Sequence, residues 1–317
     1  MSTAIANNAC NTNLIVITGP TATGKTVLGI ELAKGVGGEI VSADSMQIYK
    51  HMDIGTAKPT TCEIGDIPHH MINLISPNDD YSVARYVKDA AQCVDDILQR
   101  GKMPVLVGGS GQYIDSLIAG RTFSSRGDKN LRNELENEFD SIGGEAMLIK
   151  LREFDPDAAD RLHPNDKKRI IRAIETYMTT GKTISQHDQE TKAIPPRYTA
   201  IKFALTFTDR ADLYARIDRR VDDMMSQGLL DEVQSLLDMG VTQQFTSMQA
   251  IGYKEISNAL INNLDISDAI EQVKMESRRY AKRQLTWLRR DNDVKWITWD
   301  RTPNIDNGVN EILKLIV

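Results

Sequence analysis

The residues GPTATGKT at positions 19–26 constrain the fold of this chain more than any other stretch. Gly19, Gly24, Lys25 and Thr26 match the G-x-x-x-x-G-K-[ST] pattern of phosphate-binding loops. A short β-branched run, LIVIT, precedes the loop, and a helix-forming run, VLGIELAKG, follows it. This strand–loop–helix context argues against a chance match in a turn and predicts a phosphate site on an α/β sheet.

The loop has a defined chemistry. Its glycines let backbone N–H groups surround phosphate oxygens, and the start of the following helix adds partial positive charge. Lys25 is expected to neutralise the terminal phosphates and Thr26 to ligate Mg²⁺. The predicted phosphate-binding residues are Gly19, Pro20, Thr21, Ala22, Thr23, Gly24, Lys25 and Thr26.

The sequence lacks the second magnesium-binding motif that is typical of nucleoside triphosphatases. In those enzymes a second strand usually ends in an aspartate that organises Mg²⁺. Here the candidate strand PVLV at 104–107 continues into Gly-Gly-Ser-Gly, so no carboxylate is present to organise an attacking water. This argues against a motor, switch or ATPase and leaves a small-molecule kinase open.

Strands and helices alternate through the first third of the chain. Further strands are predicted at 39–45 and 104–107, and helices at 82–100 and 111–119. Later segments give a returning strand at 201–207, a strand at 294–299, and helices at 209–226, 229–238, 248–260, 267–290 and about 307–316. The predicted fold class is α/β: a P-loop NTPase-like parallel sheet flanked by helices, with its ligand site at the carboxyl ends of the strands.

The pattern changes at Gly120. Residues 121–197 contain amphipathic helical text such as LRNELENEF, AMLIKLREF and KKRIIRAIETYM, and end in the Pro-rich AIPPRY. We therefore predict an all-helical insertion domain, 121–197, within a P-loop core made of 1–120 and 198–317.

Composition narrows the class of protein. With 41% hydrophobic and 26% charged residues, the chain is typical of a globular protein, and its longest apolar runs are too short for a membrane span. The first residues have no basic n-region, and three widely spaced cysteines fit a reducing cytoplasm, where we expect the protein to act as a monomer. The net charge is −6, yet 167–172 and 278–290 are strongly basic, which favours local phosphate binding.

Asp44, in ADSMQIY, follows the second predicted strand and should face the same cleft as the loop. It could ligate Mg²⁺, cap the next turn as Asp often does, or act as a general base for an acceptor. A base at this position would lie beside a bound diphosphate, so the acceptor would attack the group attached to that diphosphate.

Several blocks together resemble the tRNA dimethylallyltransferase (isopentenyltransferase) family, in order and through nearly the whole chain. They are GPTATGKT, DSMQIYKHMDIGTAKP, PVLVGGSGQYI, RLHPNDKKRIIRAIE, MQAIGYKE and YAKRQLTWLR. The resemblance implies transfer of a dimethylallyl group from dimethylallyl diphosphate to N6 of adenosine 37, beside the tRNA anticodon. It also implies that the diphosphate is the leaving group, held by Lys25, the loop N–H groups and Mg²⁺, with Arg220 reaching it.

The resemblance further implies an RNA interface. A stacked adenine must be extruded into the cleft, and Asp44–Gln47 resembles the segment that reads it. The residues expected to contact the anticodon stem-loop are Asp44, Ser45, Met46, Gln47, Ser110, Arg132, Lys168, Arg169, Ile170, Ile171, Arg172, Gln249, Gly252, Tyr253, Lys254, Lys282, Arg283, Gln284, Thr286, Trp287 and Arg289. Ser110 and Gln249 stand where other members carry threonine and arginine.

Simpler interpretations compete with some of these roles. Arg220 could be an exposed helix arginine paired with Asp223, and the basic residues of 278–290 could be a solvated helix surface. Trp287 at this spacing is more often core than a base-stacking platform. His69 and His70 should face opposite ways on a strand, so we interpret them as structural.

Three other functions remain possible at this stage. A nucleotide or metabolite kinase would use the same loop but has no need of two basic patches. A prenyltransferase acting on free adenine nucleotides would lack the insertion and the basic C-terminal helix. An RNA-binding protein with a vestigial loop would not need an intact Lys25, Thr26 and Asp44.

Overall fold

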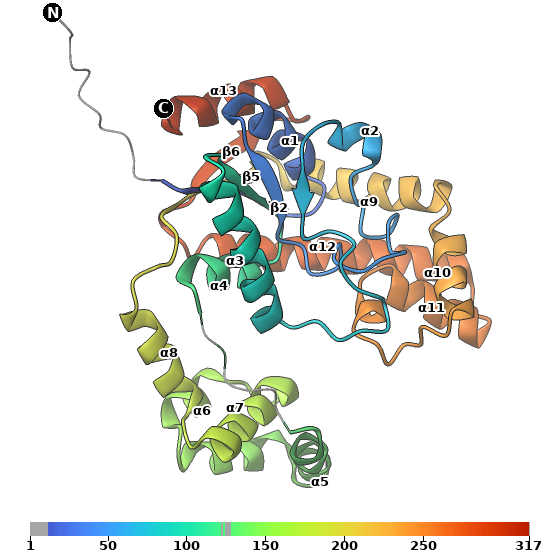
Figure 1. Cartoon of the computed structure of the whole chain (residues 1–317). Helices are drawn as coiled ribbons and strands as arrows, with labels where there is room; N and C mark the ends of the chain where they lie inside the picture. Colours follow the sequence, from blue (N-terminus) through green and yellow to red (C-terminus); the bar gives the residue numbers. More distant parts are fainter. Residues whose placement is uncertain (1–11, 122, 124–127, 317) are drawn as a thin grey trace, which may run out of the picture. The chain divides into compact units, whose positions relative to one another are not determined.

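The computed structural model describes residues 12–121, 123 and 128–316, so Cys10 and the first eleven residues lie outside the described part. The chain divides into two units (Figure 1). One comprises residues 1–118 and 198–317, and the other residues 119–197. The predicted insertion, 121–197, covers the second unit apart from two residues.

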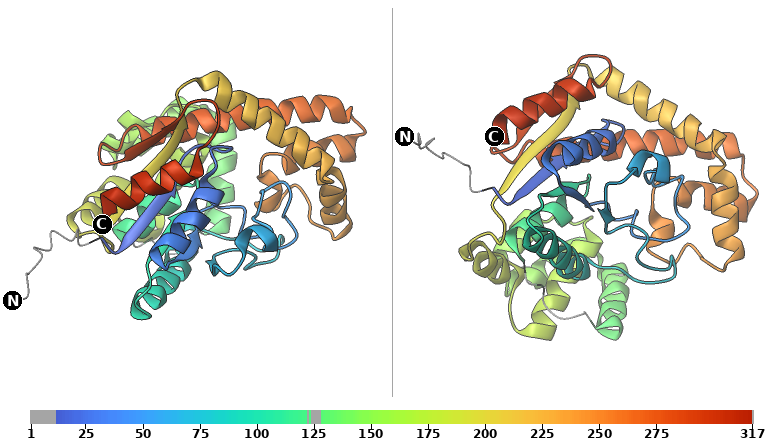
Figure 2. Two further views of the ribbon diagram at one scale, coloured as in Figure 1. Left: turned by 90° about the horizontal axis from the view of Figure 1, so that it is seen from above. Right: turned by 45° about the horizontal axis from the view of Figure 1, so that its top comes forward.

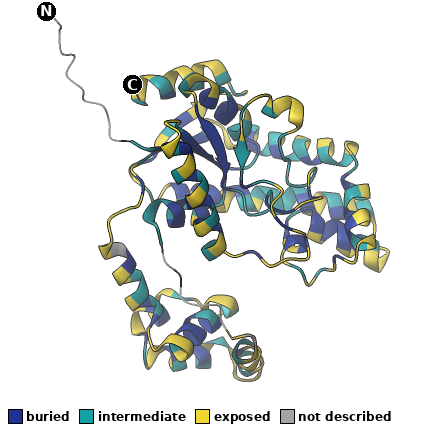
Figure 3. Cartoon of the chain, viewed as in Figure 1, coloured by how far each residue is buried: buried dark blue, intermediate teal, exposed yellow. Residues whose placement is uncertain are grey.

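A six-stranded parallel sheet forms the centre of the first unit, which confirms the predicted fold class. The strand order is β3-β2-β4-β1-β5-β6. The strands are β1 (Leu14–Thr18), β2 (Glu39–Ser42), β3 (His69–His70), β4 (Pro104–Val107), β5 (Ala200–Phe207) and β6 (Lys295–Trp299). All five residues of β1 are buried, as expected for a central parallel strand covered on both faces (Figure 3).

Helices cover both faces of this sheet (Figure 2). The helices of the first unit are α1 (Lys25–Val36), α2 (Thr61–Ile64), α3 (Val83–Gln99), α4 (Gly111–Ala119), α9 (Arg210–Ser226), α10 (Leu229–Asp238), η1 (Ser247–Gln249), α11 (Tyr253–Asn262), α12 (Ile266–Leu288) and α13 (Ile305–Ile316). Leu28 and Leu32 of α1 pack with Ile15, Ile17 and Ile312 in one buried cluster. The sheet, α1 and α13 thereby fix the position of the loop between β1 and α1.

The regular secondary structure of the second unit, within its described residues, consists of helices alone. Its helices are α5 (Lys129–Arg152), α6 (Pro156–Arg161), α7 (Lys167–Thr180) and α8 (Ile184–Ala193). Gly143 has a non-helical φ of 81° within α5, which accounts for the two helical segments expected there. Its core includes Leu135, Met147 and Ile174.

The short elements α2, β3, α6 and α8 were not predicted. Each is only two to ten residues long and gives little periodic signal. His70 on β3 lies 2.8 Å from Glu39 Oε2, and His69 Nδ1 lies 2.8 Å from the Ile67 carbonyl. Both contacts fit the structural interpretation of the histidine pair.

Candidate active site

A cleft of about 1060 Å³ opens at the carboxyl ends of β1, β2 and β4. The phosphate-binding loop forms one wall, through residues such as Thr21, Lys25 and Thr26. Residues 44–47, residues 53–60, the face of α9 within 216–227, residues 249–252 and part of α12 form the others. The cleft therefore brings together segments from widely separated parts of the sequence.

Surrounding side chains hold the backbone of the loop. Arg216 Nε donates to the Ala22 carbonyl at 3.1 Å, and Trp299 Nε1 donates to the Thr23 carbonyl at 3.0 Å. The Pro20 carbonyl accepts from Thr23 Oγ1 at 2.8 Å and from Lys25 Nζ at 2.6 Å. Since these carbonyl oxygens are engaged, the loop can turn N–H groups toward the cleft.

Glycine is required at two loop positions. Gly19 has a φ of 142°, and a Cβ there would lie 2.7 Å from the carbonyl oxygen of Leu205. Gly24 has a φ of 87° and occupies the N-cap of α1, where no side chain caps the helix among the described residues. The first-turn N–H groups of α1 are thus available to an anion.

Two cations converge beside the loop. Burial, and secondarily the nearby Arg220, lower the pKa of Lys25 to about 7, while Asp44 acts in the opposite direction. Burial also lowers the pKa of Arg220, with Asp44 again opposing the shift. Two poorly solvated like charges of this kind are stabilised by a polyanion.

Arg220 lies on α9 and lines the cleft, as the resemblance predicts. Asp223 lines the same cleft, but no ion pair joins the two residues in the described part of the chain. The alternative of an exposed, Asp223-paired arginine therefore does not describe its position. Its contact with a diphosphate stays a prediction.

Asp44 lies in the cleft and also organises its own turn. Its Oδ1 accepts from the backbone N–H of Met46 at 2.8 Å and of Gln47 at 3.4 Å. Its charge acts on Lys25 and Arg220. The capping interpretation is thus realised, and it coexists with a position facing the two cations.

Ser110 and Gln47, two of the predicted RNA contacts, form hydrogen bonds within the protein. Ser110 Oγ accepts from the backbone N–H of Ser45 at 3.1 Å. Gln47 Nε2 donates to the carbonyls of Thr56 and Ala57, each at 3.3 Å, and its Oε1 accepts from Ser42 Oγ at 3.0 Å. Gln47 therefore organises the wall of the cleft, while Met46 lines it.

Burial corrects part of the predicted RNA interface. Ile170, Ile171, Tyr253 and Gln284 are at most 6% exposed, so their side chains are not available to RNA. The isoleucines belong to the core of the second unit. Gln284 instead joins the loop after β1 to the loop after β4, accepting from the backbone N–H of Thr21 at 3.0 Å and donating to the Gly109 carbonyl at 3.0 Å.

Trp287 is half-buried and packs against α4. A Cβ added to Gly111 would lie 2.4 Å from its ring, and its Nε1 donates to Asp115 Oδ2 at 2.9 Å. The core interpretation of Trp287 therefore fits the structure better than base stacking.

The remaining predicted RNA contacts are at the surface. Lys282, Arg283 and Thr286 on α12 are exposed, as is Arg289 at its C-cap, and Arg283 also lines the cleft. Gln249 and Lys254 are exposed as well, whereas Gly252 is buried at the N-cap of α11. Their contacts with RNA stay predictions.

In the second unit, Lys168 and Arg169 are exposed, and Arg169 lies 3.7 Å from Asp166. Arg132 and Arg172 both pair at 2.9 Å with Glu175, which is fully buried. These two arginines therefore also neutralise a buried carboxylate, a role that the sequence did not reveal.

Several functional residues were missed at the sequence level. Arg216 and Trp299 hold the loop from segments almost two hundred or more positions away, so no local pattern signals them. Lys58 and Glu232 organise the cleft wall formed by residues 53–60. The block MDIGTAKP that contains Lys58 was noticed, but its contacts depend on the tertiary structure.

Comparison with known proteins finds one family along nearly the whole chain. A family model described as IPP transferase matches residues 47–291, and one described as isopentenyl transferase matches residues 12–76. A tRNA dimethylallyltransferase of Acetivibrio thermocellus is 48% identical over 91% of this chain and 92% of its own. One of Halothermothrix orenii is 48% identical over 96% and 93%.

Two solved structures extend the likeness to three dimensions. A full-length tRNA isopentenylpyrophosphate transferase of Bacillus halodurans has a TM-score of 0.72 and 41% identity, covering 96% of this chain and 95% of its own. A eukaryotic dimethylallyltransferase, described as acting on tRNA, has a TM-score of 0.80 and 32% identity, covering 96% and 77%.

Proposed function

The chain belongs to the IPP transferase family of tRNA dimethylallyltransferases, and we propose from this premise what its cleft does. It transfers a dimethylallyl group from dimethylallyl diphosphate to N6 of adenosine 37 in tRNA, giving N6-dimethylallyladenosine and diphosphate. The matched proteins carry transferase names, which supports this activity over the kinase alternative.

One observation carries the proposal: Lys25 and Arg220 converge beside the phosphate loop while Asp44 lies in the same cleft. As the bond between C1 and the diphosphate oxygen breaks, its electron pair passes to the diphosphate. Lys25, Arg220 and the N–H groups at the start of α1 stabilise the negative charge that develops there. The loop therefore serves a leaving group.

The acceptor side needs a base. The lone pair of the adenine N6 amine is delocalised into the ring, which makes the amine a weak nucleophile. Asp44 accepts the N6 proton as the new bond between N6 and C1 forms. The hydrogen bonds that Asp44 accepts from the backbone N–H groups of Met46 and Gln47 hold the carboxylate in place.

The residues present fit a magnesium ion. Thr26 provides a hydroxyl oxygen at the start of α1, within the cleft that also contains Asp44, and oxygen donors suit Mg²⁺. Among the described residues no group of three or more His, Cys, Asp or Glu side chains could hold a metal alone, so Thr26 would share the ion with diphosphate oxygens. When bound, Mg²⁺ adds positive charge on the leaving group.

The partners follow from this activity. The anticodon stem-loop of tRNA supplies the adenosine, and dimethylallyl diphosphate supplies the five-carbon group. The exposed basic residues of α12 are suited to backbone phosphates. No helix in the described part of the chain is long and apolar enough to span a membrane. We place the enzyme in the cytoplasm, with its tRNA substrate, and expect it to act as a monomer because one chain contains all parts of the cleft.

The test is direct. The purified protein is incubated with unmodified tRNA, dimethylallyl diphosphate and Mg²⁺, and the tRNA is digested to nucleosides for mass analysis. We expect an adenosine carrying one added C₅H₈ unit. A parallel reaction with labelled ATP tests the kinase alternative. Label transfer from ATP without any C₅H₈ product would overturn the proposal.

A further inference from the structure

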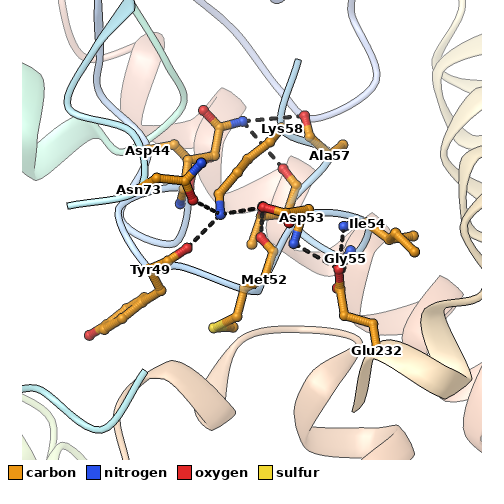
Figure 4. Close-up of polar contacts among 12 residues, drawn as sticks. Asp44, Tyr49, Met52, Asp53, Ile54, Gly55, Ala57, Lys58, Asn73 and Glu232 are labelled. Atoms are coloured by element: carbon orange, nitrogen blue, oxygen red, sulfur yellow. Dashed lines mark hydrogen bonds and ion pairs between the residues drawn. The ribbon is translucent and has the colours of Figure 1, made fainter. Parts of the chain in front are cut away.

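A carboxylate on α10 lies behind one wall of the cleft (Figure 4). Glu232 Oε2 accepts from the backbone N–H groups of Asp53 and Ile54, each at 2.8 Å. Its Oε1 accepts from the backbone N–H of Gly55 at 3.1 Å and from the hydroxyl of Tyr253. One carboxylate therefore receives four donors from two separate segments.

The first of these segments has no regular secondary structure of its own. Residues 53–60 line the cleft, and the side chain of Lys58, which is only 4% exposed, ties this segment to its neighbours. Lys58 Nζ donates to Asp53 Oδ1 at 2.7 Å and to Asn73 Oδ1 at 2.6 Å, as well as to the Tyr49 carbonyl (Figure 4). Without Glu232, three consecutive N–H groups of this segment would lose their acceptor.

The second segment enters through Tyr253, whose side chain is fully buried. This residue begins α11 directly after 249–252, which line the cleft. A Cβ on Gly55 would lie 2.5 Å from the Tyr253 ring, so the two segments are also packed closely together. Burial, and secondarily Glu232, raise the pKa of Tyr253, which keeps its hydroxyl protonated as the donor.

The first segment continues the contact toward Asp44. The carbonyls of Thr56 and Ala57 accept from Gln47 Nε2, and Gln47 N in turn donates to Asp44 Oδ1. Hydrogen bonds, together with the backbone of 53–57 and Gln47, thus connect Glu232 to the turn that holds Asp44. By contrast, the phosphate loop is held by Arg216, Trp299 and Gln284.

We infer that Glu232 is a positioning residue for the acceptor: it joins the 53–58 and 249–252 walls so that the extruded adenosine is received in one geometry. Because this role rests on the proposed function, it applies to the tRNA side of the reaction. Binding of the diphosphate should not depend on it, since the phosphate loop has separate supports.

Glu232→Gln tests the role with little change in shape. A Gln side chain can direct its oxygen to one pair of donors only, and its NH₂ group then faces the other pair. We expect the KM for tRNA to rise about tenfold or more, the effect of losing hydrogen bonds to a charged acceptor. The KM for dimethylallyl diphosphate should stay within about twofold of the wild-type value.

Asp231→Asn is the matched control. Asp231 is the preceding residue in the first turn of α10, is exposed, and makes no side-chain hydrogen bond within the described residues. Asp231→Asn removes one negative charge from the same turn as Glu232→Gln. The KM values for tRNA and for dimethylallyl diphosphate should both remain unchanged. A rise in the KM for tRNA equal to that of Glu232→Gln would assign the effect to general charge and overturn the inference.

Tyr253→Phe completes a double-mutant cycle. It removes one donor to Glu232 and keeps the ring against Gly55, so we expect a smaller rise in the KM for tRNA. The double variant should be little worse than Glu232→Gln alone, because both changes break one shared contact. Independent, multiplying effects would contradict the role of Glu232 as the joint between the two walls.

The outcomes separate this role from a purely structural one. A loss of folded enzyme lowers kcat and the melting temperature while leaving both KM values unchanged, and that result would overturn the inference. A wild-type enzyme that forms no C₅H₈-adenosine would instead refute the proposed function itself.

Discussion

Replacement of Asp44 by Asn separates the two roles that the structure gives this residue. The Asn side chain retains Oδ1, so it can still accept from the N–H groups of Met46 and Gln47. It cannot take a proton from the adenine amine. If Asp44 is the general base, transfer should slow by about 10²–10⁴-fold, or about 3–5 kcal/mol in activation free energy.

Asp44→Ala provides the second half of the test. It loses the base and also the contact with the turn, which contributes about 1 kcal/mol to stability. Both variants should therefore be slow, but only Asp44→Ala should show a lower unfolding free energy.

The assay is single-turnover transfer from dimethylallyl diphosphate to tRNA with enzyme in excess, together with urea unfolding and a tRNA binding curve for each variant. Binding should persist in both. An Asp44→Asn enzyme that transfers within about threefold of the wild-type rate, far from the effect of a lost base, would show that Asp44 only caps its turn.

Three further perturbations follow from the site. Lys25→Met should raise the unfolding free energy most at or below pH 7, because the wild-type protein there carries the full cost of burying the ammonium group. This gain should fade as the pH rises from about 7 toward 10.5, the pKa of the unfolded state, and a pH-independent difference in urea unfolding would contradict the reasoning. Lys282→Gln should weaken tRNA binding and reduce the slope of its salt dependence by about one unit. Arg278→Gln should change this slope less, because Arg278 already pairs with Asp218, and equal slopes for the two variants in binding titrations would contradict that difference. Gln284→Glu should raise the KM for dimethylallyl diphosphate about tenfold, because the Gly109 carbonyl loses its donor and a carboxylate is placed beside the phosphate loop. An unchanged KM in steady-state kinetics would show that Gln284 does not support that loop.

Local patterns predicted the elements of the fold well where they were long or strongly marked. The phosphate loop was recognisable because its two glycines, Lys25 and Thr26 form a motif of eight consecutive residues. Helix α4 and strand β5 were predicted closely, since apolar runs and Gly or Pro boundaries define them. Strand β3 has only two residues and depends on pairing with β2.

The candidate site was predictable in its chemistry and less so in its supports. Arg220 and Asp44 were identified because the resemblance and the strand ends indicated them. Gln284 shows the opposite case: its motif was recognised, but only the tertiary structure reveals that both atoms of its amide are used inside the protein. A side chain in a basic segment can serve RNA or the core, and spacing alone does not separate these.

Burial explains the remaining differences. Ile170 and Ile171 lie within a basic segment, yet they face the core of the second unit. Arg132 and Arg172 share a buried glutamate on α7 that gives no distinct signal in the sequence. Charge density along the chain therefore does not separate exposed basic side chains from apolar or paired ones in the same segment.

The central claim is that the phosphate loop stabilises a departing diphosphate and passes no phosphoryl group. The most direct measurement is the stoichiometry of one reaction, with diphosphate, orthophosphate and modified adenosine quantified together. We predict one diphosphate released for each N6-dimethylallyladenosine formed, with no orthophosphate and no phosphorylated RNA. Orthophosphate released in step with product, or phosphate transferred to the RNA, would contradict the account.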